Sequence, residues 1–258
     1  LFGMQHETEG DPAELGYREV RAGEGFSRNW DGVAPDVASF LRRDHEKPFF
    51  ASMGSFEVHR DYKQPWSTPI DRDAVKVPPY LPDCPEVRED LADFYGLVQV
   101  VDRNMAHILD ALDDTGLADN TLLLFTTDHG AAFPRAKSTL FDPGIGVTLL
   151  ARWPKAIPAD RHASGLTSHV DLLPTILELC GGTPDAKVQG RSFAGMLSDP
   201  SAAVREEIFA EKSWHGNEYA RMRCVRTTQY KFLMNFPEGF LYQTPLDSKR
   251  GLSGRVVE

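Results

Sequence analysis

Residues 121–130 read TLLLFTTDHG, and this stretch decides the fold. Leu122 to Phe125 are apolar without alternation, which predicts a strand covered on both faces. In an open α/β sheet the working groups gather just beyond the carboxyl ends of the strands. Asp128 and His129 stand at that place, and Gly130 would let the backbone turn away, so the pair could share one ion. The alternative interpretation, of about equal weight, is an Asp and a His that close a surface turn.

A long helix precedes this strand. Apolar residues recur from about Glu86 to Asp114 at alternating steps of four and three, which predicts one continuous stripe, and Gly116 is placed to end the helix. The stripe comprises Val87, Leu91, Phe94, Val98, Val101, Met105, Ile108 and Leu112.

Further elements follow from spacing and turn residues. A helix is expected over 33–44, strands over 48–55 and 146–154, and a helix over 168–182 with Asp171 as its cap, Pro174 in its first turn and Gly181 as its stop. Strands alternating with helices indicate an α/β layer with a mostly parallel sheet. From about Arg205 the texture changes to short strand-like pieces, which predict a small antiparallel subdomain. We therefore expect an α/β core over 1–200 and an incomplete antiparallel β subdomain over 201–258.

Composition excludes several classes of function. The formal net charge is -10, which argues against a sequence-independent grip on nucleic acid or an anionic membrane. No apolar run approaches the roughly 18 residues of a membrane span. The three cysteines, Cys84, Cys180 and Cys224, match neither a zinc clip nor a disulfide scaffold. Any anionic substrate must therefore be held by a local cationic pocket.

Other candidate residues follow the same logic. His59 and Arg60 leave the strand-like run over 48–55, and we favour a functional role for His59 by about two to one over a satisfied structural histidine. His6 lies in GMQHE near the start. Lys137 follows His129 by eight residues in PRAKSTLFDPG, and its spacing alone is that of an ordinary solvated lysine.

Together these segments resemble the sulfatases, a branch of the alkaline-phosphatase superfamily. DNTLLLFTTDHG, KSTLFDPGIGVTLLARWP and SHVDLLPTILELCGG follow the family's order and spacing. PFFASMGSFEVHR, VKVPPYLPDCPEVREDLADFYGLVQVVDRNM and MRCVRTTQYKFLMNF resemble the heparan N-sulfatase subgroup. The resemblance implies a three-layer α/β/α sandwich.

The resemblance also implies roles. Asp128 and His129 would be metal ligands, Lys137, His59 and Arg60 would bind substrate, and His6 and His59 would be catalytic. The metal would be a divalent cation, Ca²⁺ foremost, with Mg²⁺, Mn²⁺ or Zn²⁺ as alternatives. Family members are commonly exported or lysosomal.

Three departures from the family pattern stand out. Met4 occupies the place of a lysine, two N-terminal Asp ligands are missing, and so is the C-x-P-S-R or S-x-P-S-R motif that yields the nucleophilic formylglycine. Both ends look cut, and the missing Asp ligands and nucleophile motif lie upstream of this chain in family order, so truncation would explain their absence, with formylglycine expected from a missing N-terminal segment.

The main hypothesis is hydrolysis of a sulfate ester or sulfamate on a small sulfated substrate or glycan end by the full-length protein. The alternatives are a phosphoester or phosphonate hydrolase of the same superfamily, and a catalytically inert fragment. Oligomeric state is left open by the sequence.

Overall fold

The structure is a computed structural model that describes residues 1–21, 30–215, 218–236 and 246–257. The chain forms two compact units, Leu1–Ala118 with Leu246–Glu258, and Asp119–Pro245. The predicted boundary near residue 200 is a different division and stays a prediction. No helix in the described ranges is both long and apolar enough to cross a membrane. Short helices connect the main elements: η1 (Pro12–Leu15), η2 (Arg72–Ala74), η3 (Ala118–Asn120) and α5 (Ala194–Ser198).

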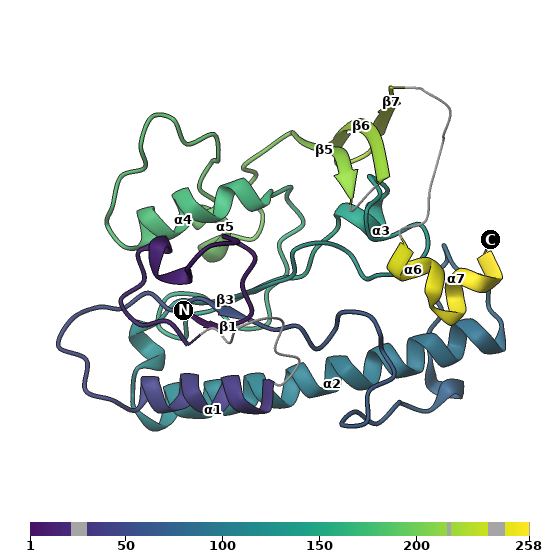
Figure 1. Cartoon of the computed structure of the whole chain (residues 1–258). Helices are drawn as coiled ribbons and strands as arrows, with labels where there is room; N and C mark the ends of the chain where they lie inside the picture. The colour runs from purple at the N-terminus through teal and green to yellow at the C-terminus, as the bar shows by residue number, and fades with distance from the viewer. Residues whose placement is uncertain (22–29, 216–217, 237–245, 258) are drawn as a thin grey trace. The chain divides into compact units, whose positions relative to one another are not determined.

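The first unit is built on the long helix α2 (Pro85–Asp114), which confirms the predicted helix. α1 (Trp30–Leu41) runs along it, as Figure 1 shows. Pro85 starts α2, where a missing N–H costs nothing, and Gly116 follows its end with a φ of 69°. Most of the predicted stripe is buried, although Val98 is 38% exposed. The buried members of the stripe are Val87, Leu91, Val101, Ile108 and Leu112.

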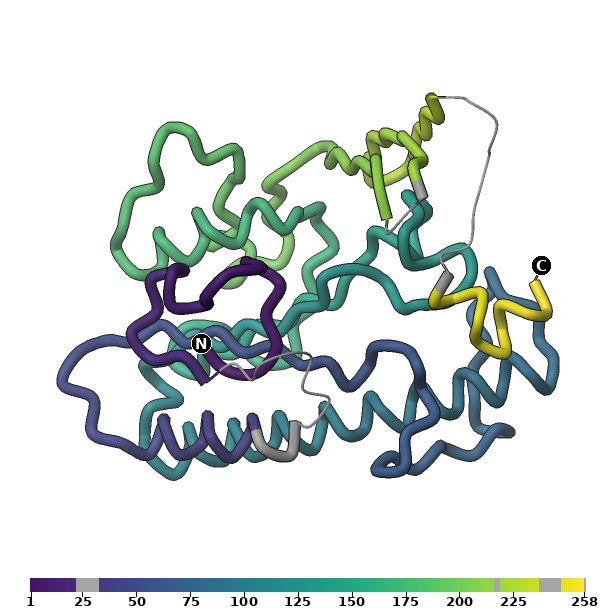
Figure 2. Tube along the Cα trace, in the orientation of Figure 1, coloured from purple at the N-terminus to yellow at the C-terminus, as the bar shows by residue number. Residues whose placement is uncertain are grey.

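The same unit contains one parallel strand pair. β1 (Phe2–Gly3) pairs with β2 (Met53–Gly54), side by side in Figure 2. The predicted strand over 48–55 is thus only two residues long, because β1 offers a partner of that length. A Cβ on Gly54 would lie 1.8 Å from the Met4 carbonyl oxygen, so only glycine fits between these backbones.

The last described residues return to α2. α6 (Leu246–Arg250) and α7 (Leu252–Val257), yellow in Figure 2, pack in the first unit, with α7 against α2. The backbone N–H of Ser253 donates to the Asp90 carboxylate of α2 at 3.1 Å, which fixes this contact.

The second unit carries the strand that decides the fold. β3 (Leu123–Thr126) pairs antiparallel with β4 (Leu149–Arg152), with Thr126 opposite Leu149. The mostly parallel sheet that the sequence predicts stays a prediction, since β1–β2 is parallel and β3–β4 is antiparallel. A parallel connection needs a long crossover, usually a helix, whereas 127–148 holds only the four-residue α3 (Asp142–Ile145). β3 is also half-buried rather than covered on both faces.

The predicted helix over 168–182 is present as η4 (His169–Asp171) and α4 (Leu172–Leu179). The Asp171 carboxylate is fully buried, accepts from the Ser168 backbone N–H at 2.9 Å, and forms an ion pair with Arg205. Gly181 has a φ of 76° just beyond the helix, as a helix stop requires.

The predicted antiparallel pieces form one sheet of β5 (Glu207–His215), β6 (Glu218–Thr227) and β7 (Lys231–Asn235), in the order β5-β6-β7. α3 lies next to this sheet in Figure 1, where the Lys231 ammonium is 2.6 Å from the Asp142 carboxylate. That ion pair joins the sheet to the turn that follows Lys137.

Candidate functional site

Asp128 and His129 leave β3 together and face one another. The Nε2 atom of His129 lies 3.3 Å from Oδ2 of Asp128, and the His129 backbone N–H donates to Oδ1 at 2.9 Å. The Asp128 side chain is 83% exposed and that of His129 is 38% exposed, so both can be reached by a ligand. The two side chains are therefore oriented toward one another, and their functional role stays a prediction.

The ring of His129 is held in one tautomer. Its Nδ1 lies 2.7 Å from the carbonyl oxygen of Gly130, which can only accept, so Nδ1 carries the proton. In the neutral ring Nε2 then presents a lone pair toward the Asp128 carboxylate. Two acceptors at that distance repel each other unless a positive charge lies between them.

This donor set fits a divalent cation. Metal-binding histidines commonly donate their other ring N–H to a backbone carbonyl, as His129 does. Atoms 3.3 Å apart can both reach one ion through bonds of about 2.0–2.4 Å. In the described ranges no three His, Cys, Asp or Glu residues are grouped to hold a metal. The role of Asp128 and His129 as metal ligands stays a prediction, which this geometry fits.

Lys137 is buried, with only 6% of its surface exposed, which separates it from an ordinary solvated lysine. Its backbone N–H donates to the Ala131 carbonyl at 3.2 Å. Arg135 and Ser138 on either side of it have positive φ values of 65° and 61°. Non-glycine residues seldom adopt that conformation unless the surrounding structure enforces it, so the loop holds Lys137 in a defined position.

Gly130 ties this loop to the Asp128–His129 pair. Its N–H donates to the Gly144 carbonyl at 3.0 Å, and a Cβ would lie 1.7 Å from the Pro143 oxygen. Glycine is therefore required at position 130 by the close approach of two backbones.

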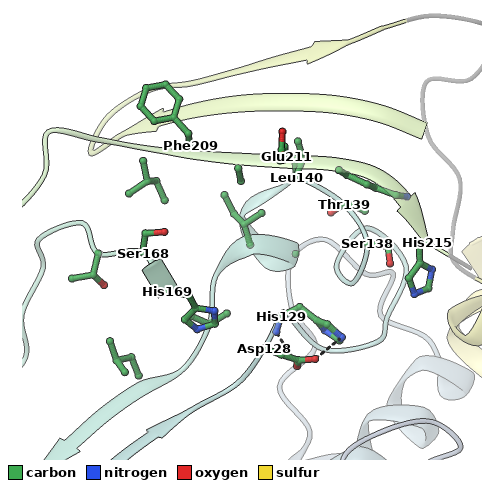
Figure 3. Close-up of a pocket in the computed structure, with 18 of the residues that line it drawn as sticks. Asp128, His129, Ser138, Thr139, Leu140, Ser168, His169, Phe209, Glu211 and His215 are labelled. Atoms are coloured by element: carbon green, nitrogen blue, oxygen red, sulfur yellow. Dashed lines mark hydrogen bonds and ion pairs between the residues drawn. The ribbon is translucent and has the colours of Figure 1, made fainter. Parts of the chain in front are cut away.

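A pocket of about 330 Å³ opens beside the pair, entirely within the second unit. Figure 3 shows Asp128, His129 and His169 on one side of it and β5, with Phe209 and Glu211, on the other. The lining mixes polar and apolar side chains. The polar members are Asp128, His129, Ser138, Thr139, Thr167, Ser168, His169, Glu211, Lys212 and His215.

Two histidines of this pocket, His169 and His215, were missed by the sequence. His215 falls in a strand-like segment where a lone histidine has no distinguishing signal. His169 had one usable signal, because it stands two positions before Asp171, the expected cap of a helix.

His6 and His59 belong to the first unit. They follow β1 and β2, the two paired parallel strands, so both come after carboxyl strand ends at the same edge. Nδ1 of His59 lies 2.7 Å from the Arg60 carbonyl oxygen, and its ring stacks on Phe56 at 4.4 Å. His59 is thus fixed in the same tautomer as His129. The convergence of His59 with Asp128, His129 and Lys137 stays a prediction.

Arg60 is engaged elsewhere. Its guanidinium, 5% exposed, forms two hydrogen bonds of 2.8 and 2.7 Å with the Asp90 carboxylate of α2. It also lies 4.1 Å from the centre of the Tyr62 ring. This bidentate buried pair favours a structural role, and substrate binding by Arg60 stays a prediction that the geometry does not favour.

Two carboxylates around the pocket have perturbed pKa values. Burial alone would raise the pKa of Asp171, but hydrogen bonds from Arg205 and from the Arg191 and Ser168 backbone N–H groups outweigh it and lower the pKa. A hydrogen bond from Lys231 lowers the pKa of Asp142. In both cases the neighbouring cation, Arg205 or Lys231, favours the ionised form of the carboxylate.

Sequence comparison identifies two families in the chain. Residues 27–182, more than half of the chain, match the family described as Sulfatase, and residues 133–244 match the family described as N-sulphoglucosamine sulphohydrolase, C-terminal.

Two curated relatives illustrate the range of similar proteins. Human N-sulphoglucosamine sulphohydrolase is 30% identical over 85% of this chain and 50% of its own length. An ulvan-active sulfatase of Formosa agariphila is 31% identical over 66% of this chain and 28% of its own length. The chain thus spans half or less of the length of these relatives.

Solved structures agree on the fold. One, described as part of glycosaminoglycan metabolism by Bacteroides thetaiotaomicron, has a TM-score of 0.61 at 24% identity over 79% of this chain and 48% of its own. Another, in complex with its substrate D-glucosamine-2-N,6-O-disulfate, has a TM-score of 0.52 at 24% identity over 57% of this chain and 32% of its own. The α/β class predicted from the sequence is confirmed, and the chain belongs to the sulfatase family.

Proposed function

We propose that the protein containing this chain hydrolyses a sulfate ester or a sulfamate on a small sulfated sugar or a glycan chain end. The observation that carries the proposal is the Asp128–His129 pair, in which Nε2 of a ring fixed through Gly130 meets a carboxylate oxygen at 3.3 Å. The net charge of -10 supports a short substrate, because a long polyanion would be repelled.

Each candidate residue has a defined task in this proposal. Asp128 and His129 hold a divalent cation, Ca²⁺ foremost. Lys137, buried and fixed by its loop, donates to the sulfate oxygens, where a cation in a dry site is worth more than in water. His59 also contacts the sulfate, and its Nε2 can hold or move a proton because Nδ1 is committed to Arg60. His6 assists near the nucleophile.

The proposed reaction needs two groups that these 258 residues do not supply. A bound divalent cation supplies positive charge toward the sulfate oxygens, and formylglycine supplies the nucleophile. Since the nucleophile motif is absent from the sequence, we expect the 258-residue chain to be inactive by itself.

The test compares the chain with the full-length protein that contains it. The full-length protein should hydrolyse N-sulfoglucosamine or 4-nitrocatechol sulfate and lose that activity with EDTA. The 258-residue chain should hydrolyse neither. Full-length protein that cleaves a phosphodiester such as bis(4-nitrophenyl) phosphate, and neither sulfate, would contradict the proposal and favour a phosphoester hydrolase.

A further inference from the structure

His169 is fixed against the strand that delivers Asp128. Its Nε2 lies 3.1 Å from the hydroxyl oxygen of Thr126, the last residue of β3. Thr126 stands two positions before Asp128, so this contact places His169 close to the Asp128–His129 pair. His169, Asp128 and His129 line the same pocket, and Figure 3 shows them on the same side of it.

The hydrogen bond assigns the tautomer of His169. The Thr126 hydroxyl has one hydrogen, and its oxygen lies 2.9 Å from the Thr148 carbonyl oxygen and 3.3 Å from the Thr127 carbonyl oxygen, both of which can only accept. With its hydrogen donated to a backbone carbonyl, the hydroxyl accepts the 3.1 Å contact, and Nε2 of His169 supplies the proton. In the neutral ring Nδ1 is then a bare acceptor, and no residue in the described ranges donates to it.

A bare acceptor selects the chemistry of its partner. Sulfate oxygens accept hydrogen bonds and donate none, so a neutral His169 offers them nothing. The hydroxyl and N–H groups of a sugar do donate. The pocket also has exposed aromatic side chains, Phe209 at 70% and Trp214 at 65%, which suit the apolar face of a sugar ring.

We propose that His169 positions the sugar of the substrate by accepting a hydrogen bond from one of its hydroxyl or N–H groups at Nδ1. The inference rests on the proposed function and deepens it. Asp128, His129 and Lys137 serve the sulfate group, whereas His169 recognises the part of the substrate that carries the sulfate. His169 is thus a determinant of specificity.

The first test examines the tautomer without any activity. In the full-length protein labelled with ¹⁵N-histidine, the ring nitrogens of His169 should show a protonated Nε2 and a bare Nδ1 at neutral pH. Thr126→Val should abolish that preference. A ring protonated at Nδ1 would overturn the inference.

The second test separates the sugar from the sulfate. His169→Gln keeps an N–H toward Thr126 and removes the acceptor at Nδ1. It should lower kcat/KM for N-sulfoglucosamine by about threefold to tenfold, as for one lost hydrogen bond. It should leave kcat/KM within about twofold for 4-nitrophenyl sulfate, whose leaving group has no donor. His169→Asn, which places an acceptor near the Nδ1 position, should recover part of the loss.

His162→Gln, the same change at an exposed histidine outside the pocket, should alter neither substrate. Equal losses on both substrates, or none, in His169→Gln would overturn the inference while leaving the proposed function intact. Wild-type protein that hydrolyses neither sulfate would defeat the proposed function and this inference with it.

Discussion

Nε2 of His129 lies 3.3 Å from Oδ2 of Asp128, while the opposite nitrogen of the same ring is held by the Gly130 carbonyl. Asp128→Asn should weaken binding of the divalent cation by at least tenfold, because it removes the charged half of the pair. Calorimetric titration of the full-length protein with Ca²⁺ and Mn²⁺ measures the change. Asp119→Asn, the same loss of charge at an exposed site, is the control. If Asp128→Asn bound the cation as tightly as Asp119→Asn, Asp128 would not be a metal ligand.

Lys137 should be essential for turnover and dispensable for folding. Lys137→Met removes a cation that is 6% exposed, and we expect kcat to fall by about 10²- to 10³-fold, as for other lost charge-stabilising donors. The far-ultraviolet circular dichroism spectrum should stay unchanged. Lys155→Met, at an exposed lysine, should keep full activity. A Lys137→Met protein with near wild-type kcat would show that this lysine does not contact the sulfate.

Arg60 should matter for stability. Arg60→Ala leaves the Asp90 carboxylate buried without its partner, and we expect the free energy of unfolding in urea to fall by about 3–5 kcal/mol. Lys63→Ala breaks an ion pair in which the lysine is 77% exposed, and it should cost less than about 1 kcal/mol. Replacing Arg60 and Asp90 together by Met and Leu should cost less than Arg60→Ala alone. If Arg60→Ala cost no more than Lys63→Ala, the pair would not be structural.

Asp171 predicts a dependence of stability on pH. Its folded pKa is lowered, so its contribution is fully present above the unfolded pKa of about 4 and is lost as the pH falls through the folded pKa. Asp171→Asn should therefore lower the melting temperature strongly at pH 7 and much less near pH 3. Melting curves of the wild-type protein and Asp171→Asn between these pH values measure how the difference in melting temperature decreases as the pH falls. A difference that stays constant with pH would show that Arg205 does not set the ionisation of Asp171.

Local sequence signals predicted the elements well. The apolar spacing of α2 and the cap and stop of the α4 segment reflect interactions within a few residues, and Asp171 and Gly181 stand where expected. The direction of β4 depends on a partner 29 positions away, Leu123 opposite Arg152, together with the form of the connection between them. The rule for parallel sheets could not supply that information.

The residues of the candidate site also differ in whether nearby or distant parts of the sequence determine their position. Asp128 and His129 were identified because two possible ligands stand next to each other in the sequence, directly after an apolar run. The burial of Lys137 depends on a loop with two residues in the left-handed conformation, Arg135 and Ser138. Neither is glycine, so the sequence gives no sign of that conformation. His169 joins the pocket through Thr126, 43 residues earlier, so spacing alone could not reveal it.

The backbone crossing at Gly130 has a consequence for how this part of the molecule can vary. A Cβ on residue 130 would lie 1.7 Å from the Pro143 carbonyl oxygen, so any other amino acid would force these two backbone segments apart. The hydrogen bond from the Gly130 N–H to the Gly144 carbonyl closes the loop 130–144, and no Cβ fits at the point of closure. A larger side chain at Gly130 would therefore disturb both the Asp128–His129 pair just before the loop and Lys137 within it.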